Sequence, residues 1–198
     1  AGISVASIEK KNVSSSAQLL FSHSSKELRL IVDDLNHFST NFIAEQILSA
    51  LGKTSNGSYD SELGIKRVNE YLLGLGVSAN EFRIVDASGL SHEDRISPRG
   101  LVRVLMNAIH DPASGAEFLS SLSVLGRSGT LQHRRLSDSL LVLRGKTGTI
   151  DGVTALVGML VTKNGRSLVF ALLQNDVNSR DESLKLEQSI VQALYLRE

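Results

Sequence analysis

The residues best suited to chemistry form the run Lys146-Thr147-Gly148-Thr149, which follows a short apolar stretch at residues 140–143. Lysine offers a positive charge, threonine offers a hydroxyl group, and a glycine without a Cβ lets a ligand backbone approach closely. We therefore expect Lys146 to attract a substrate carboxylate, and Thr147 and Thr149 to hydrogen-bond it. The plain alternative is a strand with an exposed lysine beside a turn, because such a triplet arises by chance in roughly one chain in ten of this length.

A second polar set lies at Ser39-Thr40-Asn41, where one predicted helix gives way to another. A serine and an asparagine two residues apart at such a junction can direct both side chains into one cleft. Helix capping is the competing explanation, because Ser, Thr and Asn are the residues preferred at helix starts. On spacing alone, capping is favoured by about two to one.

The composition limits the classes of function. Hydrophobic residues make up 41% and charged residues 21% of the 198 positions, which is typical of a globular chain with a buried core. Acidic and basic residues number 21 each, and this balance argues against general nucleic-acid binding and against adhesion to anionic membranes. The chain has no cysteine, and its five histidines are too scattered for a classical zinc site. No apolar run reaches the length of a membrane span.

Helical patterns fill the first two thirds of the chain. Ser24 and Glu27 are spaced as a capping box, and apolar residues follow at helical intervals from Leu28 to Phe38. A second apolar face runs from Phe42 to Leu51, and Gly52 stands where a left-handed C-cap is expected. Further helices are predicted from Ile65 to Leu75, from Ser97-Pro98 to Ala108, from Ser114 toward Gly126, and from Leu184 to Leu196 with Leu186, Ile190 and Leu194 facing inward.

Strand patterns dominate the last third. Val153–Val161 and Leu168–Leu173 are apolar runs, and the intervening Asn164-Gly165 is a strong hairpin signal. We expect the two runs to pair antiparallel, with helices covering both faces of the sheet because both runs are apolar on both sides. The order of elements predicts an α+β fold, in which an antiparallel sheet packed with helices joins a helical lobe. Weaker strand patterns occur at Ile3–Ile8, Ala17–Phe21, Phe82–Val85 and Leu140–Leu143.

Four ordered segments resemble the active-site serine penicillin-recognising enzymes, and in particular the D-alanyl-D-alanine carboxypeptidase/endopeptidase family of low-molecular-mass penicillin-binding proteins. Leu35–Glu45 resembles the family's Ser-x-Asn helix, and Lys146–Thr149 resembles its Lys-Thr-Gly strand. Asp86–Ser91 resembles its Asp-Gly-Ser-Gly-Leu-Ser turn, with alanine at the second position. Gly126–Leu131, with Arg134 beyond it, resembles a further family segment. The ordered set is more specific than any single motif.

The resemblance implies a fold like that of penicillin-binding transpeptidases and β-lactamases, and a role for each motif residue. In such enzymes the serine of a Ser-x-x-Lys motif attacks a D-Ala-D-Ala amide or a β-lactam and forms an acyl-enzyme. Ser39 would relay protons to the leaving group, Asn41 would orient the substrate amide, and Lys146 would supply positive potential. The strand Thr147-Gly148-Thr149 would hold the terminal carboxylate, and its last N–H would form half of the oxyanion hole.

The nucleophile motif itself has no convincing match. Ser7-Ile8-Glu9-Lys10 fits the letters, but a polar run follows where the family has a buried apolar helix, and Ser39 comes too soon after it. The first residues also read like the interior of a chain. We therefore interpret the sequence as the C-terminal part of one penicillin-recognising domain, with the nucleophile upstream or on another chain. The helical lobe would cover about 25–125, and the sheet strands with the C-terminal helix about 138–198.

The leading hypothesis is a serine-type D-Ala-D-Ala carboxypeptidase or endopeptidase that acts on peptidoglycan stem peptides in the bacterial periplasm or cell envelope. It would need no metal or cofactor, and β-lactams would be its covalent inhibitors. The alternative is a non-catalytic peptidoglycan-binding or scaffold module that has lost the nucleophile. A β-lactamase relative would need a deacylating carboxylate near the cleft, and no glutamate has a recognisable context for that. The sequence leaves open whether carboxypeptidase or endopeptidase action dominates.

Overall fold

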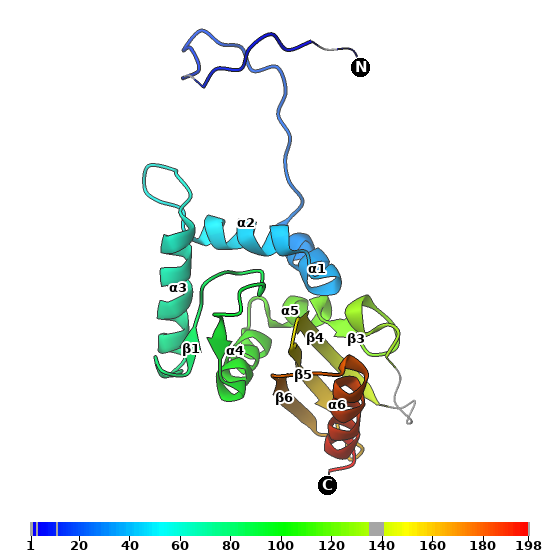
Figure 1. Ribbon diagram of the computed structural model, residues 1–198. Coiled ribbons are helices and arrows are strands. Elements are labelled where there is room, and N and C mark those ends of the chain that lie inside the picture. The colour runs from blue at the N-terminus through cyan, green and yellow to red at the C-terminus, as the bar shows by residue number, and fades with distance from the viewer. Residues whose placement is uncertain (1, 3, 11, 135–140, 198) are drawn as a thin grey trace.

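A four-stranded antiparallel sheet with the order β3-β4-β5-β6 forms the centre of the computed structural model, which describes residues 2, 4–10, 12–134 and 141–197 (Figure 1). The strands are β3 (Ser123–Val124), β4 (Val142–Ile150), β5 (Val153–Val161) and β6 (Ser167–Gln174), and a separate pair joins β1 (Phe82–Arg83) to β2 (Arg95–Ile96). The helices are α1 (Leu28–Phe38), α2 (Asn41–Leu51), α3 (Ser61–Gly74), α4 (Pro98–His110), α5 (Gly115–Ser121), the short 3-10 helix η1 (Gly129–Leu131) and α6 (Arg180–Tyr195). The order is the predicted one, with helices before the main sheet and a helix after it.

The β5–β6 hairpin confirms the prediction made from its two apolar runs. β5 has the predicted bounds, and β6 extends one residue beyond the prediction at each end. The two strands pair antiparallel, with Thr154 opposite Gln174. At the turn, Gly165 takes the left-handed conformation (φ 85°), and its N–H donates to the Thr162 carbonyl at 2.9 Å.

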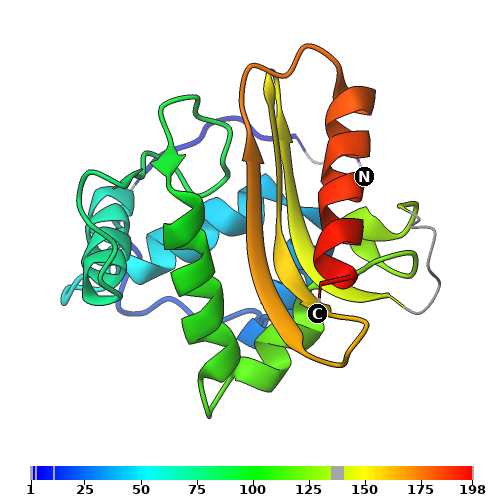
Figure 2. The ribbon, with the colours of Figure 1, turned by 90° about the horizontal axis from the view of Figure 1, so that it is seen from below.

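Helices cover both faces of the sheet, as predicted, but they cover them unequally. Figure 2 shows α6 on one face and α4 on the other. Leu156 and Leu160 of β5 are buried in the core together with Val191 and Tyr195 of α6. Residues between them on β5, such as Val157, point to the opposite face and remain partly exposed. The face toward α4 and the helical lobe is therefore the more open one.

The inward face of α6 differs from the predicted one. Leu186 was expected in the core but is 50% exposed, and Ile190 and Leu194 are only partly buried. The helix is rotated because Glu187 occupies a core position, where it forms an ion pair with Arg134 at 2.6 Å. The buried residues of the helix follow at intervals of one turn: Ser183, Glu187, Val191 and Tyr195.

Helix starts were predicted with mixed success. Ser97 caps α4 as expected, because its Oγ accepts the Gly100 N–H at 2.9 Å and proline follows at the first helical position. The capping box predicted at Ser24 is wrong. α1 begins at Leu28, its cap residue is Glu27, and no side chain caps its first turn.

Gly52 follows α2 for a reason other than the predicted left-handed cap. Its φ is −84°, so any residue could adopt this backbone. A Cβ built on Gly52 would lie 1.7 Å from the Asp60 carbonyl oxygen, and one on Gly64 would lie 2.2 Å from the Leu48 carbonyl oxygen. Both glycines are thus required by the close approach of α2 to the start of α3.

The weaker strand predictions near the N-terminus are wrong. The described residues of 3–8, and residues 17–21, have no regular structure. Their large apolar side chains are exposed, and Leu20 is 94% exposed. Figure 1 shows this segment extending away from the helices and the sheet.

Two other strand predictions are corrected in their bounds. Only the first two residues of Phe82–Val85 form a strand, because β1 pairs with a β2 of equal length. β4 runs to Ile150, so the Lys146 segment lies within a strand and not after it. Leu140, where a strand was predicted to start, and the lobe boundary near residue 138 lie outside the described residues.

Substitution of Gly52 tests the helix packing. We expect Gly52→Ala to destabilise the chain by about 1–3 kcal/mol, because the added methyl meets a backbone carbonyl that cannot move freely. Gly74→Ala is the matched control, since a Cβ there meets nothing within 4 Å. It should raise stability by about 0.4–1 kcal/mol. Urea unfolding measures both, and equal effects would contradict the packing argument.

Candidate active site

Two of the predicted site residues meet across the two halves of the fold. The Lys146 Nζ on β4 donates a hydrogen bond to the Ser39 Oγ at the end of α1. It also donates to the Thr147 carbonyl at 2.8 Å. A serine of the helical region and a lysine of the sheet therefore lie side by side, as the ordered motifs predicted.

The backbone of Ser39 is held in an unusual conformation. It has φ 53° and ψ 46°, and its N–H donates to the Leu35 carbonyl at 2.8 Å, which closes the last turn of α1. A left-handed conformation costs a non-glycine residue about 1–2 kcal/mol. The sharp turn separates α1 from α2 by two residues and directs the Ser39 hydroxyl to Lys146. Such strain is often found at functional sites.

Lys146 is a cation without an acidic partner. It is partly buried, and no salt bridge among the described residues involves it. Burial lowers the pKa of Lys146 from its ordinary value, because loss of water disfavours the ammonium form. An anionic group brought beside Lys146 would favour the ammonium form and raise this pKa again.

The outer edge of β4 is open where the threonines lie. β3 pairs only with Arg144 and Gly145. The Leu143 carbonyl accepts the Leu125 N–H at 3.0 Å, so Leu143 faces this edge, and every second residue after it does the same. The backbone N–H and C=O groups of Thr147 and Thr149 therefore face an edge that no described strand covers.

The side chains of this strand differ in their surroundings. The Thr147 Oγ1 donates to the Thr130 Oγ1 at 2.8 Å, so a neighbouring loop fixes its position. Gly148 and Thr149 are exposed. Asn41 is the first residue of α2 and is also exposed, and no hydrogen bond of its side chain to another described residue occurs. It therefore shares the turn with Ser39, whereas the hydrogen bonds of the Lys146 Nζ go to Ser39 and Thr147.

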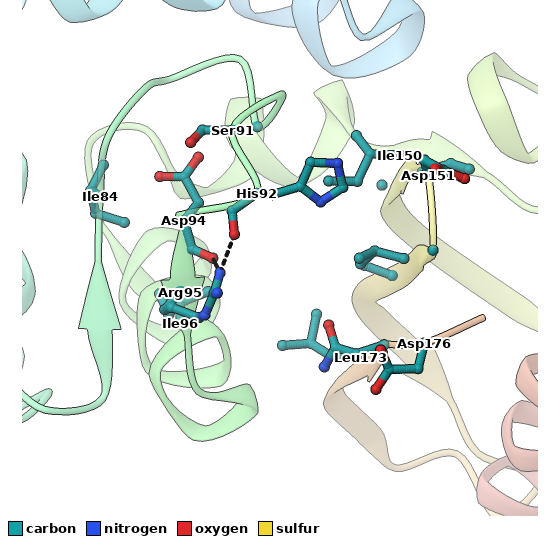
Figure 3. A pocket seen from close by; sticks show the side chains of 17 residues that line it. Ile84, Ser91, His92, Asp94, Arg95, Ile96, Ile150, Asp151, Leu173 and Asp176 are labelled. Carbon is teal, nitrogen blue, oxygen red and sulfur yellow. Dashed lines mark hydrogen bonds between the residues drawn. The ribbon is translucent and has the colours of Figure 1, made fainter.

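A cavity of about 660 Å³ opens beside the end of this strand. Gly148 to Ile150 line one side, and residues 89–96, which connect the turn to β2, line the other. Figure 3 shows His92 pointing toward Ile150, whereas Asp94 turns toward Ser91. The sequence interpretation treated the residues of this turn as turn formers and missed the cavity.

Carboxylates hold the turn that borders the cavity. The Glu45 Oε1 of α2 accepts the N–H groups of Ala87 and Ser88, both at 2.9 Å. Since Glu45 lies one turn after Asn41, the Ser-x-Asn helix and the turn form one unit. The Asp86 Oδ2 accepts the Ser91 N–H at 2.8 Å.

Two aspartates of this turn are shifted in opposite directions. Burial alone would raise the pKa of Asp86, but hydrogen bonds from Gly89, Ser91 and Ser88 together lower it. Burial is the main reason that the pKa of Asp94 is raised. Hydrogen bonds thus outweigh burial at Asp86, whereas burial and the neighbouring Asp86 charge outweigh the hydrogen bonds at Asp94.

The segment with the letters of the nucleophile motif lies apart from this site. Ser7 and Lys10 are exposed and belong to the irregular segment before α1 (Figure 1). They do not share a helix, so the serine and the lysine do not lie one turn apart. The described residues bring Ser39 and Lys146 together and supply no serine in a Ser-x-x-Lys helix beside them.

The family model described as the D-Ala-D-Ala carboxypeptidase 3 (S13) family matches residues 1–195. The D-alanyl-D-alanine carboxypeptidase of an Actinomadura species is 33% identical over 165 residues, which are 80% of this chain and 30% of that protein. Carboxypeptidase DacB of Mycolicibacterium smegmatis is 30% identical over 157 residues, 76% of this chain and 33% of that protein. The chain thus spans about a third of the length of these relatives.

Solved structures share the fold at lower identity. Penicillin binding protein 4 from Haemophilus influenzae, complexed with a β-lactam, superposes with a TM-score of 0.78 at 23% identity, covering 87% of this chain and 42% of that one. A class A β-lactamase from Bacteroides cellulosilyticus superposes with a TM-score of 0.64 at 18% identity, covering 85% of this chain and 62% of that one. The predicted penicillin-binding-protein and β-lactamase-like α+β fold is confirmed.

The pH dependence of stability tests the burial of Lys146. Because its pKa is lowered in the folded state, the folded chain releases a proton that the unfolded chain still binds, and stability rises with pH through that interval. Lys146→Met removes this dependence. We therefore expect the stability of Lys146→Met relative to the original chain to fall as pH rises from about 7 to about 10.

Urea unfolding across this pH range measures the difference. Lys163→Met, at an exposed position in the β5–β6 turn, is the matched control for loss of a lysine. A Lys146→Met difference that does not change with pH would contradict the burial argument.

Proposed function

Because the chain belongs to the D-Ala-D-Ala carboxypeptidase 3 (S13) family, we propose that it forms part of a serine-type D-Ala-D-Ala carboxypeptidase or endopeptidase acting on peptidoglycan stem peptides. The observation that carries the proposal is the contact of the Lys146 Nζ with the Ser39 Oγ beside an open strand edge. The two groups come from segments 107 residues apart in the sequence. Together they form a polar, positively charged patch next to the edge of β4 that no described strand covers.

The strand edge suits an extended peptide that ends in a carboxylate. The N–H groups of Thr147 and Thr149 and the Thr149 C=O face the open edge and can pair with a peptide backbone as an added strand would. Lys146 attracts the terminal carboxylate, and the threonine hydroxyls hydrogen-bond it. Gly148 has no side chain, so a peptide backbone can approach the strand between the two threonines. The Thr149 N–H then lies where it can stabilise an oxyanion at the scissile carbonyl.

Ser39 and Asn41 act on the substrate from the helical side. In this proposal the Ser39 hydroxyl passes a proton to the leaving amine, because Lys146 contacts it and the lowered pKa of this lysine eases proton exchange. The exposed Asn41 amide, with no intramolecular partner among the described residues, orients the substrate amide.

The attacking serine lies outside these 198 residues in this proposal. The curated relatives are about three times as long as the part matched here, since that part makes up 30% and 33% of two of them. Ser7 is exposed and not helical. A Ser-x-x-Lys helix elsewhere in the full-length protein would place its serine between Ser39 and the Thr149 N–H.

The cellular setting follows from the substrate. Peptidoglycan stem peptides place the enzyme in the bacterial periplasm or cell envelope, and β-lactams are expected to be covalent inhibitors. The structure of penicillin binding protein 4 with a β-lactam supports this expectation. In the parts of the chain that the structure describes, no helix is long and apolar enough to cross a membrane.

We also infer that this part of the protein has two lobes, with a helical lobe at about 25–125 and a sheet with its C-terminal helix at about 138–198.

One observation favours a second candidate function. The described residues contain no serine–lysine pair one helical turn apart at the site, which suits a peptidoglycan-binding module without catalysis. A covalent adduct distinguishes the two candidates.

Labelling with penicillin is the direct test. The full-length protein should form a covalent adduct with a labelled penicillin, because acylation precedes any release of product. Mass spectrometry of peptides should locate the adduct on a serine outside residues 1–198. Heat-denatured protein is the control. A folded protein that forms no adduct would contradict the enzymatic proposal and favour the binding module, and an adduct on Ser39 or Ser7 would place the nucleophile in this chain.

Asparagine substitution tests the role of the helical side. Asn41→Ala should slow acylation of the full-length protein by about fivefold, because a hydrogen bond to the substrate amide is worth about 1 kcal/mol. Asn80→Ala, at an exposed turn position before β1, is the control and should leave the rate unchanged. Acylation rate constants at limiting penicillin concentration provide the measurement. Equal rates for both variants would remove Asn41 from the site.

A further inference from the structure

We propose that the buried ion pair of Arg134 and Glu187 positions the Thr147 hydroxyl for carboxylate binding, by holding the loop at residues 124–134 that carries Thr130. The inference rests on the proposed function, because it assigns positioning residues to the same site. Neither residue of the ion pair contacts the substrate in this scheme. They act through the loop, and the loop acts through Thr130.

Glu187 is a charge in an apolar core. It is 1% exposed, and its Oε2 accepts a hydrogen bond from the Arg134 Nη1 at 2.6 Å. Its Oε1 accepts one from the Gln174 Nε2 at 3.4 Å. Leu131, Leu143, Leu156 and Val191 surround a cavity of about 250 Å³ beside this pair.

Stability alone gives no reason for this pair. Removing two charges from water costs energy that their attraction often fails to repay, and apolar residues of similar size commonly replace such pairs without loss. An ion pair does fix the position of its two elements more narrowly than apolar contact does. The pair joins α6 to the loop, so the loop is the element whose position it determines.

Backbone hydrogen bonds and close packing hold the loop between Arg134, which forms the ion pair, and Thr130, which contacts Thr147. The Gly126 N–H and the Arg134 N–H both donate to the Leu131 carbonyl, at 3.0 Å and 3.1 Å. Leu131 is fully buried in the core. A Cβ built on Gly129 would lie 2.1 Å from the Ser123 Oγ, so η1 rests directly on β3. A shift of Arg134 therefore moves the neighbouring Thr130.

Thr130 determines whether the Thr147 hydroxyl can donate its hydrogen bond to a carboxylate. In the structure, the Thr147 Oγ1 donates to the Thr130 Oγ1 at 2.8 Å. A hydroxyl both donates and accepts, so the bond can reverse when a carboxylate arrives. Thr130 then donates to Thr147, and the Thr147 hydrogen turns to the carboxylate. This exchange requires the two oxygens to stay within hydrogen-bond reach.

The same buried network extends beneath the other threonine of the strand. The Gln174 Nε2 also donates to the Thr154 Oγ1 at 3.2 Å, and this hydroxyl shares a hydrogen bond of 2.5 Å with the Ser183 Oγ. Thr154 lies directly opposite Thr149 in the β4–β5 register. α6 thus supports the strand at both of its carboxylate-binding positions.

Four variants of the full-length protein test the proposal. Glu187→Gln keeps the shape and the amide contact but leaves Arg134 without its counter-charge. Thr130→Val removes the hydroxyl at the loop tip, and the double variant combines both. Val191→Ala is the matched control, because it removes apolar area from the same buried face of α6 without touching the ion pair.

Two measurements are made on each variant: hydrogen exchange of the amides in residues 126–134, and the second-order rate constant of acylation by a labelled penicillin. Glu187→Gln should raise loop exchange at least about tenfold and slow acylation by about 10–100-fold, as expected for a displaced binding group. Val191→Ala should lower the thermal midpoint but leave the acylation rate unchanged. In the Thr130→Val background, Glu187→Gln should have little further effect, since both act on one hydroxyl.

The contrary results are equally specific. Unchanged loop exchange in Glu187→Gln overturns the inference, whatever the acylation data show. Effects of Glu187→Gln and Thr130→Val that multiply in the double variant also overturn it, because Glu187 would then act by another route. A wild-type protein that no penicillin acylates refutes the proposed function instead, and loop exchange still decides whether Glu187 holds the loop.

Discussion

The site depends on a positive charge that is partly removed from water and has no acidic partner among the residues that the structure describes. Lys146 meets Ser39 across 107 residues of sequence, and this contact ties the sheet to the first helix of the helical lobe. Burial lowers the pKa of Lys146, so the structure pays an energetic cost to keep this amine here. That cost falls when an anion arrives, because attraction between opposite charges is strong where water is excluded. The fold is therefore prepared for a ligand with a negative group.

The open edge of β4 gives direction to that attraction. β3 is two residues long and pairs only with Arg144 and Gly145, so no described strand pairs with β4 on this edge at Thr147 and beyond. An uncovered strand edge invites unwanted pairing, and proteins usually protect it. Here a ligand that pairs as an extended strand would cover the edge and place its negative end near Lys146. In the proposed function, charge and edge together favour an extended peptide over a compact anion.

The sequence predicted what local patterns determine. The β5–β6 hairpin follows from two apolar runs and an Asn-Gly turn, and the cap at Ser97 follows from a serine before a proline. The resemblance placed Ser39 and Lys146 in one site, although only the structure shows their contact. Other features depend on residues far apart in the chain. Gly52 serves a close approach to Asp60, which no pattern within α2 reveals.

The inward face of α6 shows most clearly why the rest could not be predicted. A helix with Leu186, Ile190 and Leu194 in register suggests an apolar face, and a glutamate beside it suggests solvent. Glu187 enters the core because Arg134, 53 residues earlier, meets it there. The rule that charged residues are exposed fails when the partner is supplied by another element. The pattern of apolar residues within one helix does not reveal a charged partner on another element.

Three long-range contacts assemble this part of the site: Lys146 with Ser39, Glu45 with the turn at residues 86–91, and Arg134 with Glu187. None of them involves a residue before Leu28. These contacts hold the strand, the helix junction and the turn to one another through residues that follow Leu28 in the chain. Preorganised groups of this kind lower the entropy cost of ordering a ligand. A nucleophile brought to the edge of β4 would meet a binding surface already formed, and only its own placement would remain to be determined.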